Sequence, residues 1–128
     1  MLKLVSKYLN ELSRAEEFIR AAKENISFSL RTSANRMYFA LERVVVSYLL
    51  FKEIEVPLNH QKLWEVAAVN LGEDYYNCLR ELYDLRMQAD YGFSSNIVKL
   101  NKEVVKKYIV KIEFYIHEIK NKIKNKEK

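Results

Sequence analysis

The chain has 128 residues and a mass of 15.3 kDa, a size that usually forms one domain around one hydrophobic core. Its two glycines and one proline are too few for the tight turns of a β-rich fold, so long helices with few connections are expected. The apolar fraction of 49% excludes a disordered chain, and the net charge of +5 is compatible with a nucleic-acid or nucleotide partner.

Two long helices are predicted in the first half of the chain. Residues 3–24 carry one apolar stripe at alternating spacings of three and four, formed by Val5, Tyr8, Leu12, Ala15, Ile19 and Ala22. A second helix, from about Ser29 to Ile54, is apolar on more than one face. Such a helix either runs through the centre of the fold or packs one face on a second copy, and we favour a homodimer.

A short third helix is predicted after a loop. The loop is the stretch EIEVPLN, because Pro57 cannot continue a helix. Asn59 is then placed to cap a helix over residues 60–71, and Gly72 is placed to end it.

The fourth and fifth helices are predicted from similar signals. The fourth begins at Glu73 or Asp74 and ends just before Gly92, where the irregular loop GFSSNIVKLN starts. Asn101 is expected to cap the last helix. The prediction is therefore an all-α fold, an antiparallel four- to five-helix bundle with four long helices and a short one.

We expect a single domain over residues 1–128, with a basic tail from about residue 120 to 128. The single cysteine, Cys78, excludes an internal disulfide and fits a reducing cytoplasm. The N-terminus carries charges throughout, and no stretch approaches the apolar length of a membrane span. These features predict a cytoplasmic protein that does not interact with a membrane.

Several kinds of chemistry lack their sequence signatures. The chain has no glycine-rich phosphate loop, so a nucleotide fold of the Walker or dinucleotide type is excluded. His117 and Glu118 resemble the start of a zinc-protease helix, but Asn121 stands where the second histidine is needed. His60 is the other histidine of the chain, so we predict neither a metal site nor a cofactor.

Three polar features exceed what a plain helical bundle needs. The first is LRMQADYGF, where Arg86 precedes Asp90. This order is the weaker one for an ion pair within a helix, and an acid in the last turn opposes the helix dipole. The other two are SANRMYFA, before the apolar part of the second helix, and NHQKL, at the start of the third. Groups outside the fourth helix are therefore expected to bind the side chains of Arg86 and Asp90.

In this order the segments ANRMYFA, NHQKL and RMQADYG resemble the HEPN family, the nucleotide-binding helical domains of higher eukaryotes and prokaryotes, and most of all its small prokaryotic branch. The resemblance covers roughly residues 29–120. It implies a helical bundle, usually a homodimer, whose polar motifs meet at a cleft near the dimer interface. Many members are encoded beside a minimal nucleotidyltransferase and act with it as a toxin–antitoxin pair. Catalytically active members are metal-independent ribonucleases.

The resemblance also implies the site residues. Those for binding RNA or nucleotide are Asn35, Arg36, Tyr38, His60 and Arg86, and those for catalysis are Arg86, Asp90 and Tyr91. The motif of active members is an arginine, four to six residues, and a histidine. Here Tyr91 occupies the first such place after Arg86, and no histidine follows until His117. Asp90 as a base, or His60 brought in by folding or by a second subunit, would have to replace that histidine.

Three hypotheses follow from the sequence. The first is a HEPN protein that acts with a nucleotidyltransferase in a toxin–antitoxin or defence role and binds RNA or nucleotide phosphate in a dimer cleft. The second is a metal-independent ribonuclease with a degenerate motif. The third is a non-catalytic structural or interaction module, in which Arg86 belongs to an internal salt-bridge network.

Overall fold

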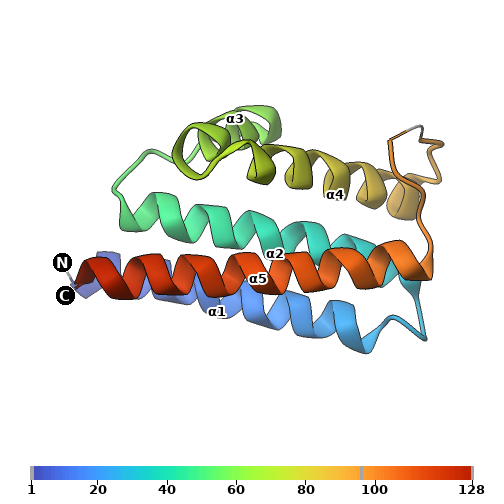
Figure 1. Ribbon diagram of the computed structural model, residues 1–128, viewed down its shortest axis with the longest axis horizontal. Coiled ribbons are helices and arrows are strands. Elements are labelled where there is room, and N and C mark those ends of the chain that lie inside the picture. The colour runs from blue at the N-terminus through green and yellow to red at the C-terminus, as the bar shows by residue number, and fades with distance from the viewer. Residues whose placement is uncertain (1, 96, 128) are drawn as a thin grey trace.

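The computed structural model describes residues 2–95 and 97–127, with side chains described over 7–95 and 97–125. Across these residues the chain forms helices and no strand: α1 (Leu2–Glu24), α2 (Leu30–Phe51), α3 (His60–Leu71), α4 (Glu73–Tyr91) and α5 (Lys102–Glu127). Each long helix runs antiparallel to the long helix before it, and the shorter α3 packs on α4 (Figure 1). The predicted all-α bundle is confirmed.

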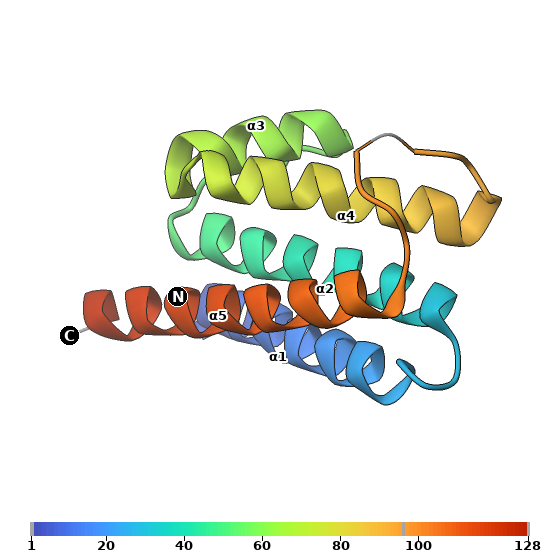
Figure 2. The ribbon, with the colours of Figure 1, turned by 45° about the vertical axis from the view of Figure 1, so that its right-hand side comes forward.

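Helix α2 lies at the centre of the bundle and packs on α1, α4 and α5 (Figure 2). Most of its large apolar side chains are fully buried, among them Met37, Tyr38, Leu41, Val44, Val45 and Leu49, whereas Phe39, Tyr48, Leu50 and Phe51 are partly exposed. One chain therefore covers most, but not all, of the apolar surface of α2. Among the described residues, no helix, α2 included, has both the length and the apolar character that crossing a membrane requires.

The predicted stripes of the outer helices face the same core. On α1 the buried members are Tyr8, Leu12, Ala15, Ile19 and Ala22, whereas the side chain of Val5 lies outside those described. On α5 the buried members are Val105, Tyr108, Ile109, Ile112, Ile116, Ile119 and Ile123. These residues join α2, α3 and α4 in one hydrophobic cluster, so the helices share a single core.

The predicted helix ends are largely confirmed by their capping bonds. The Asn59 side chain accepts from the backbone N–H of Lys62 at 3.1 Å, and Asn101 accepts from Val104 at 2.9 Å. Helix α4 ends at Tyr91, and the next residue, Gly92, has a left-handed φ of 68° that is disfavoured for residues with a side chain.

The end of α2 differs from the prediction. The helix ends at Phe51, before the predicted Ile54, because Glu53 adopts a left-handed φ of 57°. The N–H of Ile54 then bonds back to the carbonyl of Leu49 at 2.8 Å, and that of Glu53 to Leu50 at 3.1 Å. These bonds satisfy carbonyls that the helix end leaves open, without the glycine that usually marks such a stop.

Two tyrosines connect α4 with α5 through carboxylates. The Tyr75 hydroxyl donates to Glu118 Oε1 at 2.5 Å, and the Tyr108 hydroxyl donates to Glu81 Oε1 at 2.6 Å. Burial, helped by these carboxylate acceptors, raises the pKa of both phenols. Both hydroxyls therefore stay protonated at neutral pH, as donors must.

Candidate functional site

Asp90, in the last turn of α4, is held by side chains from two helices. Its Oδ2 accepts from Arg86 Nε at 3.2 Å and from Asn35 Nδ2, on α2, at 3.1 Å. The second bond explains the unfavourable order of charges on α4, because the acid also satisfies a group on another helix. The contact joins the end of α4 to the beginning of α2.

The guanidinium of Arg86 lies on aromatic rings. Its Cζ is 4.9 Å from the ring centroid of Phe39 and 5.8 Å from those of Tyr38 and Tyr83. Cation–π contacts of this kind fix the plane of an arginine. The side chain is 19% exposed, and among the described residues its two terminal nitrogens have no hydrogen-bond acceptor. They are therefore available to bind the oxygens of a phosphate.

A pocket of about 380 Å³ lies beside these residues, between the start of α2 and the end of α4. This α2–α4 pocket is lined by Arg31, Thr32, Asn35, Arg36, Ala89 and Asp90. Arg36 donates to Asn35 Oδ1 at 2.8 Å and lies 5.9 Å from the ring of Phe18. Neither Arg31 nor Arg36 has an acidic partner among the residues that the structure describes. The pocket therefore carries uncompensated positive charge.

His60, the first residue of α3, joins the same cluster. Its Nδ1 lies 3.1 Å from the hydroxyl of Tyr38, which also accepts from Trp64 Nε1 at 3.3 Å. The ring of His60 is 5.2 Å from that of Tyr83, the tyrosine that also contacts Arg86. Burial raises the pKa of Tyr38, with the Glu42 carboxylate adding to the effect and the Trp64 bond opposing it. The Tyr38 hydroxyl is therefore protonated at neutral pH.

Glu42 is a site residue that the sequence reasoning missed. It is 8% exposed, and its Oε2 lies 3.5 Å from His60 Nδ1. Its Oε1 accepts from Arg43 at 3.0 Å, and Arg43 also bonds to Glu11 at 2.6 Å. A signal was present in the stretch YFALERVVVSYLL, where an acid interrupts a nearly apolar run four residues after Tyr38. A buried acid in such a run needs a partner.

Tyr91 lies apart from this cluster. Its side chain is 61% exposed, and its ring stacks on that of Phe93 at 5.7 Å between centroids. The other predicted site residues are connected through the contacts above: Asn35, Arg36, Tyr38, His60, Arg86 and Asp90. Among the described residues, no group of three or more His, Cys, Asp or Glu side chains gathers as metal ligands would.

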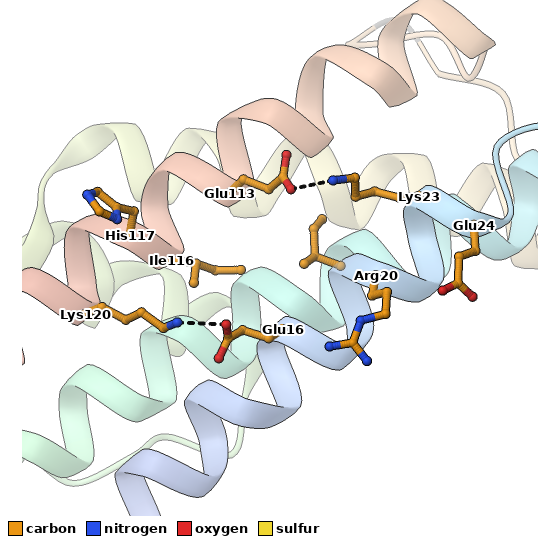
Figure 3. Close-up of a pocket in the computed structure, with 9 residues that line it drawn as sticks. Glu16, Arg20, Lys23, Glu24, Glu113, Ile116, His117 and Lys120 are labelled. Carbon is orange, nitrogen blue, oxygen red and sulfur yellow. Dashed lines mark hydrogen bonds and ion pairs between the residues drawn. The ribbon is translucent and has the colours of Figure 1, made fainter.

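A larger hollow, of about 440 Å³, lies between α1 and α5 and contains none of these residues (Figure 3). In this α1–α5 groove, Lys23 pairs with Glu113 at 2.9 Å and Lys120 pairs with Glu16 at 2.7 Å. His117 is exposed and bonds to Asn121 of its own helix. Because most of its charges are paired, the α1–α5 groove offers less to a charged ligand than the smaller pocket does.

The sequence model described as the HEPN domain matches residues 9–123 of the chain. The match begins in α1 and reaches nearly the end of α5, so it includes every residue of the candidate site. A comparison with curated proteins finds no match.

Proposed function

The chain belongs to the HEPN domain family, and we propose on that premise that it binds the phosphates of RNA or of a nucleotide at Arg86. The observation that carries the proposal is the environment of the Arg86 side chain, which is fixed in place but keeps free donors. Three rings and Asp90 fix its plane, while its terminal nitrogens have no acceptor among the described residues. A fixed, planar fork with free donors matches two oxygens of one phosphate.

The surroundings of Arg86 support an anionic ligand. Asp90 is the ion-pair partner of Arg86, and the same carboxylate oxygen also accepts from Asn35. Arg31 and Arg36 add positive charge in the adjoining α2–α4 pocket. Long-range attraction and short-range hydrogen bonding therefore act at one place.

The proposed partner is a minimal nucleotidyltransferase, and the proposed role is in a toxin–antitoxin or related defence system. We further propose that the protein acts as a homodimer whose interface borders the cleft at Arg86. Membership in the HEPN family supports both statements. The apolar surface of α2 adds little support, because one chain already covers most of it.

RNA binding by Arg86→Ala tests the proposal, with Arg80→Ala as the matched control. Arg80 lies on the same helix and is exposed, so both variants remove one positive charge from α4. Fluorescence anisotropy with a labelled single-stranded RNA should show roughly tenfold or greater weakening for Arg86→Ala, since a hydrogen bond to a charged group contributes about 1.5–3 kcal/mol. Arg80→Ala should bind like the unchanged protein.

Equal affinity of Arg86→Ala and Arg80→Ala would contradict the proposal. If the unchanged protein binds no phosphate ligand and Arg86→Ala loses about 3 kcal/mol of stability, Arg86 is instead part of a structural network. Light scattering on the same samples gives the mass in solution, and a monomer at every concentration would rule out the homodimer.

A further inference from the structure

We infer that an unpaired base of the bound RNA stacks on the ring pair of Tyr91 and Phe93, so that the site selects single-stranded RNA. The inference rests on the proposed binding of RNA phosphate at Arg86. The two rings lie 5.7 Å apart between centroids, with 28° between their planes. Their side chains are 61% and 60% exposed. Stacked rings that face water offer a flat surface to a further ring.

The ring pair directly follows the acid of the α2–α4 pocket in the chain. Asp90 lines that pocket and accepts from Arg86 at 3.2 Å and from Asn35 at 3.1 Å. Tyr91 is the next residue, so its Cα lies about 3.8 Å from that of Asp90. The start of α2 and the end of α4 lie at the same end of the bundle (Figure 1). One short stretch of RNA therefore reaches both the arginines and the rings.

The backbone after α4 holds the two rings together. Gly92 has a left-handed φ of 68°, and its N–H bonds back to the carbonyl of Gln88 at 2.9 Å. The Gln88 side chain donates to the carbonyl of Val98 at 2.6 Å and accepts from the N–H of Leu100 at 3.1 Å. Val98 and Leu100 pack against the core, whereas Phe93 stays on the surface. A loop anchored in this way presents its ring in a defined position, which lowers the entropy cost of binding.

Charge favours a nucleic acid over a protein surface as the occupant. Arg31 and Arg36 line the α2–α4 pocket, and the free terminal nitrogens of Arg86 lie next to it. Asp90 is the only acid among the described residues that line the pocket. An apolar protein partner would cover the two rings but would leave these cations without anions. A strand of RNA brings bases for the rings and phosphates for the arginines.

Stacking on the ring pair requires a base with a free face. In a duplex each base is paired and lies between its neighbours in the stack, so that its faces are covered. In a single strand a base turns out and places one face on an aromatic side chain. The three arginines suit more than one phosphate, which favours a strand over a single nucleotide.

The affinity of the full chain for three labelled ligands tests the inference. The ligands are an oligoadenylate, its duplex with oligouridylate, and a strand of equal length in which abasic spacers replace the nucleotides. Fluorescence anisotropy should show oligoadenylate bound roughly 5–150-fold more tightly than the abasic strand, the usual contribution of one stacked base. Oligoadenylate should also bind more tightly than the duplex, and AMP should displace it only weakly.

The double variant Tyr91→Ala/Phe93→Ala separates stacking from charge, with Val110→Ala/Phe114→Ala as its matched control. Val110 and Phe114 are 67% and 61% exposed and lie on α5, which contributes no described residue to the α2–α4 pocket. The first variant should bind oligoadenylate as weakly as the abasic strand. Its affinity for the abasic strand and its plot of log affinity against log salt should stay unchanged, because no charge is removed. The control should bind every ligand like the unchanged protein.

Two conservative changes show whether the flat ring itself is needed. Tyr91→Phe keeps both rings and should bind oligoadenylate like the unchanged protein. Tyr91→Leu/Phe93→Leu keeps apolar side chains without a ring face, so it should bind as weakly as the double alanine variant. Thermal unfolding followed by circular dichroism verifies that all variants fold.

The outcomes distinguish this inference from the proposed function. Equal affinity of the unchanged protein for oligoadenylate and the abasic strand overturns the inference and leaves phosphate binding at Arg86 standing. Binding of neither strand overturns both. The inference also fails if the double alanine variant binds like its control, or if the double leucine variant keeps full affinity. If the double alanine variant loses affinity for both strands alike and its mass in solution falls, the ring pair is a contact between copies, and the inference is overturned.

Discussion

The α1–α5 groove and the α2–α4 pocket have similar volumes, about 440 and 380 Å³, but opposite arrangements of charge. Lysine–glutamate pairs bridge the α1–α5 groove at 2.7 and 2.9 Å. In the α2–α4 pocket, Arg31 and Arg36 have no acidic partner among the described residues. The first surface already satisfies most of its own charges, whereas the second keeps positive charge that no acid of the described residues compensates.

The layers behind the two surfaces differ as well. The α1–α5 groove has Ile19 and Ile116, both nearly buried, among the residues that line it. Behind Arg86 lies a buried polar network of Tyr38, Trp64 and Glu42. Volume therefore does not distinguish the two surfaces. Unpaired charge in front of a buried, satisfied polar network is the better guide to a functional site.

The largest expected effect concerns this buried layer at alkaline pH. The pKa of Tyr38 is raised by burial, whereas a tyrosine in the unfolded chain loses its proton near about pH 10. The stability that the protonated Tyr38 phenol gives the folded chain is therefore fully present below about pH 10. Above that pH, the free energy of unfolding falls by about 1.4 kcal/mol per pH unit for each such tyrosine. Tyr75, Tyr108 and Tyr115 should act likewise, and Cys78, whose pKa burial raises to about 12, joins them. Urea unfolding at a series of alkaline pH values measures this slope.

The variant Tyr38→Phe measures how much of this alkaline loss of stability comes from Tyr38. The variant should lose about 1–3 kcal/mol at neutral pH, because Trp64 Nε1 is left without its acceptor. Above pH 10 its free energy of unfolding should then fall less steeply than that of the unchanged protein. The difference in slope should equal the contribution of one tyrosine. Lys120→Ala, in the α1–α5 groove, should leave the slope unaltered. An unchanged slope in Tyr38→Phe would mean that its phenol does not stay protonated.

The next largest effect is on RNA affinity, which should depend on the surface from which positive charge is removed. The double variant Arg31→Ala/Arg36→Ala should bind single-stranded RNA less tightly. Its plot of log affinity against log salt should also flatten, by roughly 0.7 for each arginine that contacts a phosphate. Arg20→Ala/Lys23→Ala removes the same charge from the α1–α5 groove and should leave the slope of the plot unchanged. Equal losses would show that the net charge of +5 attracts RNA over the whole surface, and the distinction between the two surfaces would fail.

Sequence reasoning predicted the fold well where the determining contacts are local. Asn59 and Asn101 accept from N–H groups three residues ahead, and Gly92 ends the helix formed by the residues just before it. The end of α2 was predicted too late because Glu53 takes a left-handed conformation that only its surroundings stabilise. The choice between a central α2 and a dimer was equally non-local, since it depends on which helices pack on α2.

The candidate site was predictable only in part. The poor order of Arg86 and Asp90 indicated an outside partner, but Asn35 lies 55 residues away from Asp90 in the chain. Glu42 gave a weaker signal, because a single glutamate is ordinary in a helix until its burial is known. Its contact with His60 depends on how α3 packs on α4, which no local pattern encodes.

The smallest expected effect is on stability, at the ion pairs of the α1–α5 groove. Lys23 and Glu113 are 53% and 41% exposed, so water screens their attraction, and holding two long side chains together costs entropy. Lys23→Ala should therefore cost less than about 1 kcal/mol, and the coupling with Glu113→Ala in a double-mutant cycle should be about 0.2–1 kcal/mol and fade at high salt. Urea unfolding of the four proteins measures it. A coupling clearly above this range that survives high salt would show that the α1–α5 groove holds its charges rigidly. Rigid pairing would make this groove a preorganised site of its own, and the contrast with the α2–α4 pocket would then rest on Arg31 and Arg36 alone.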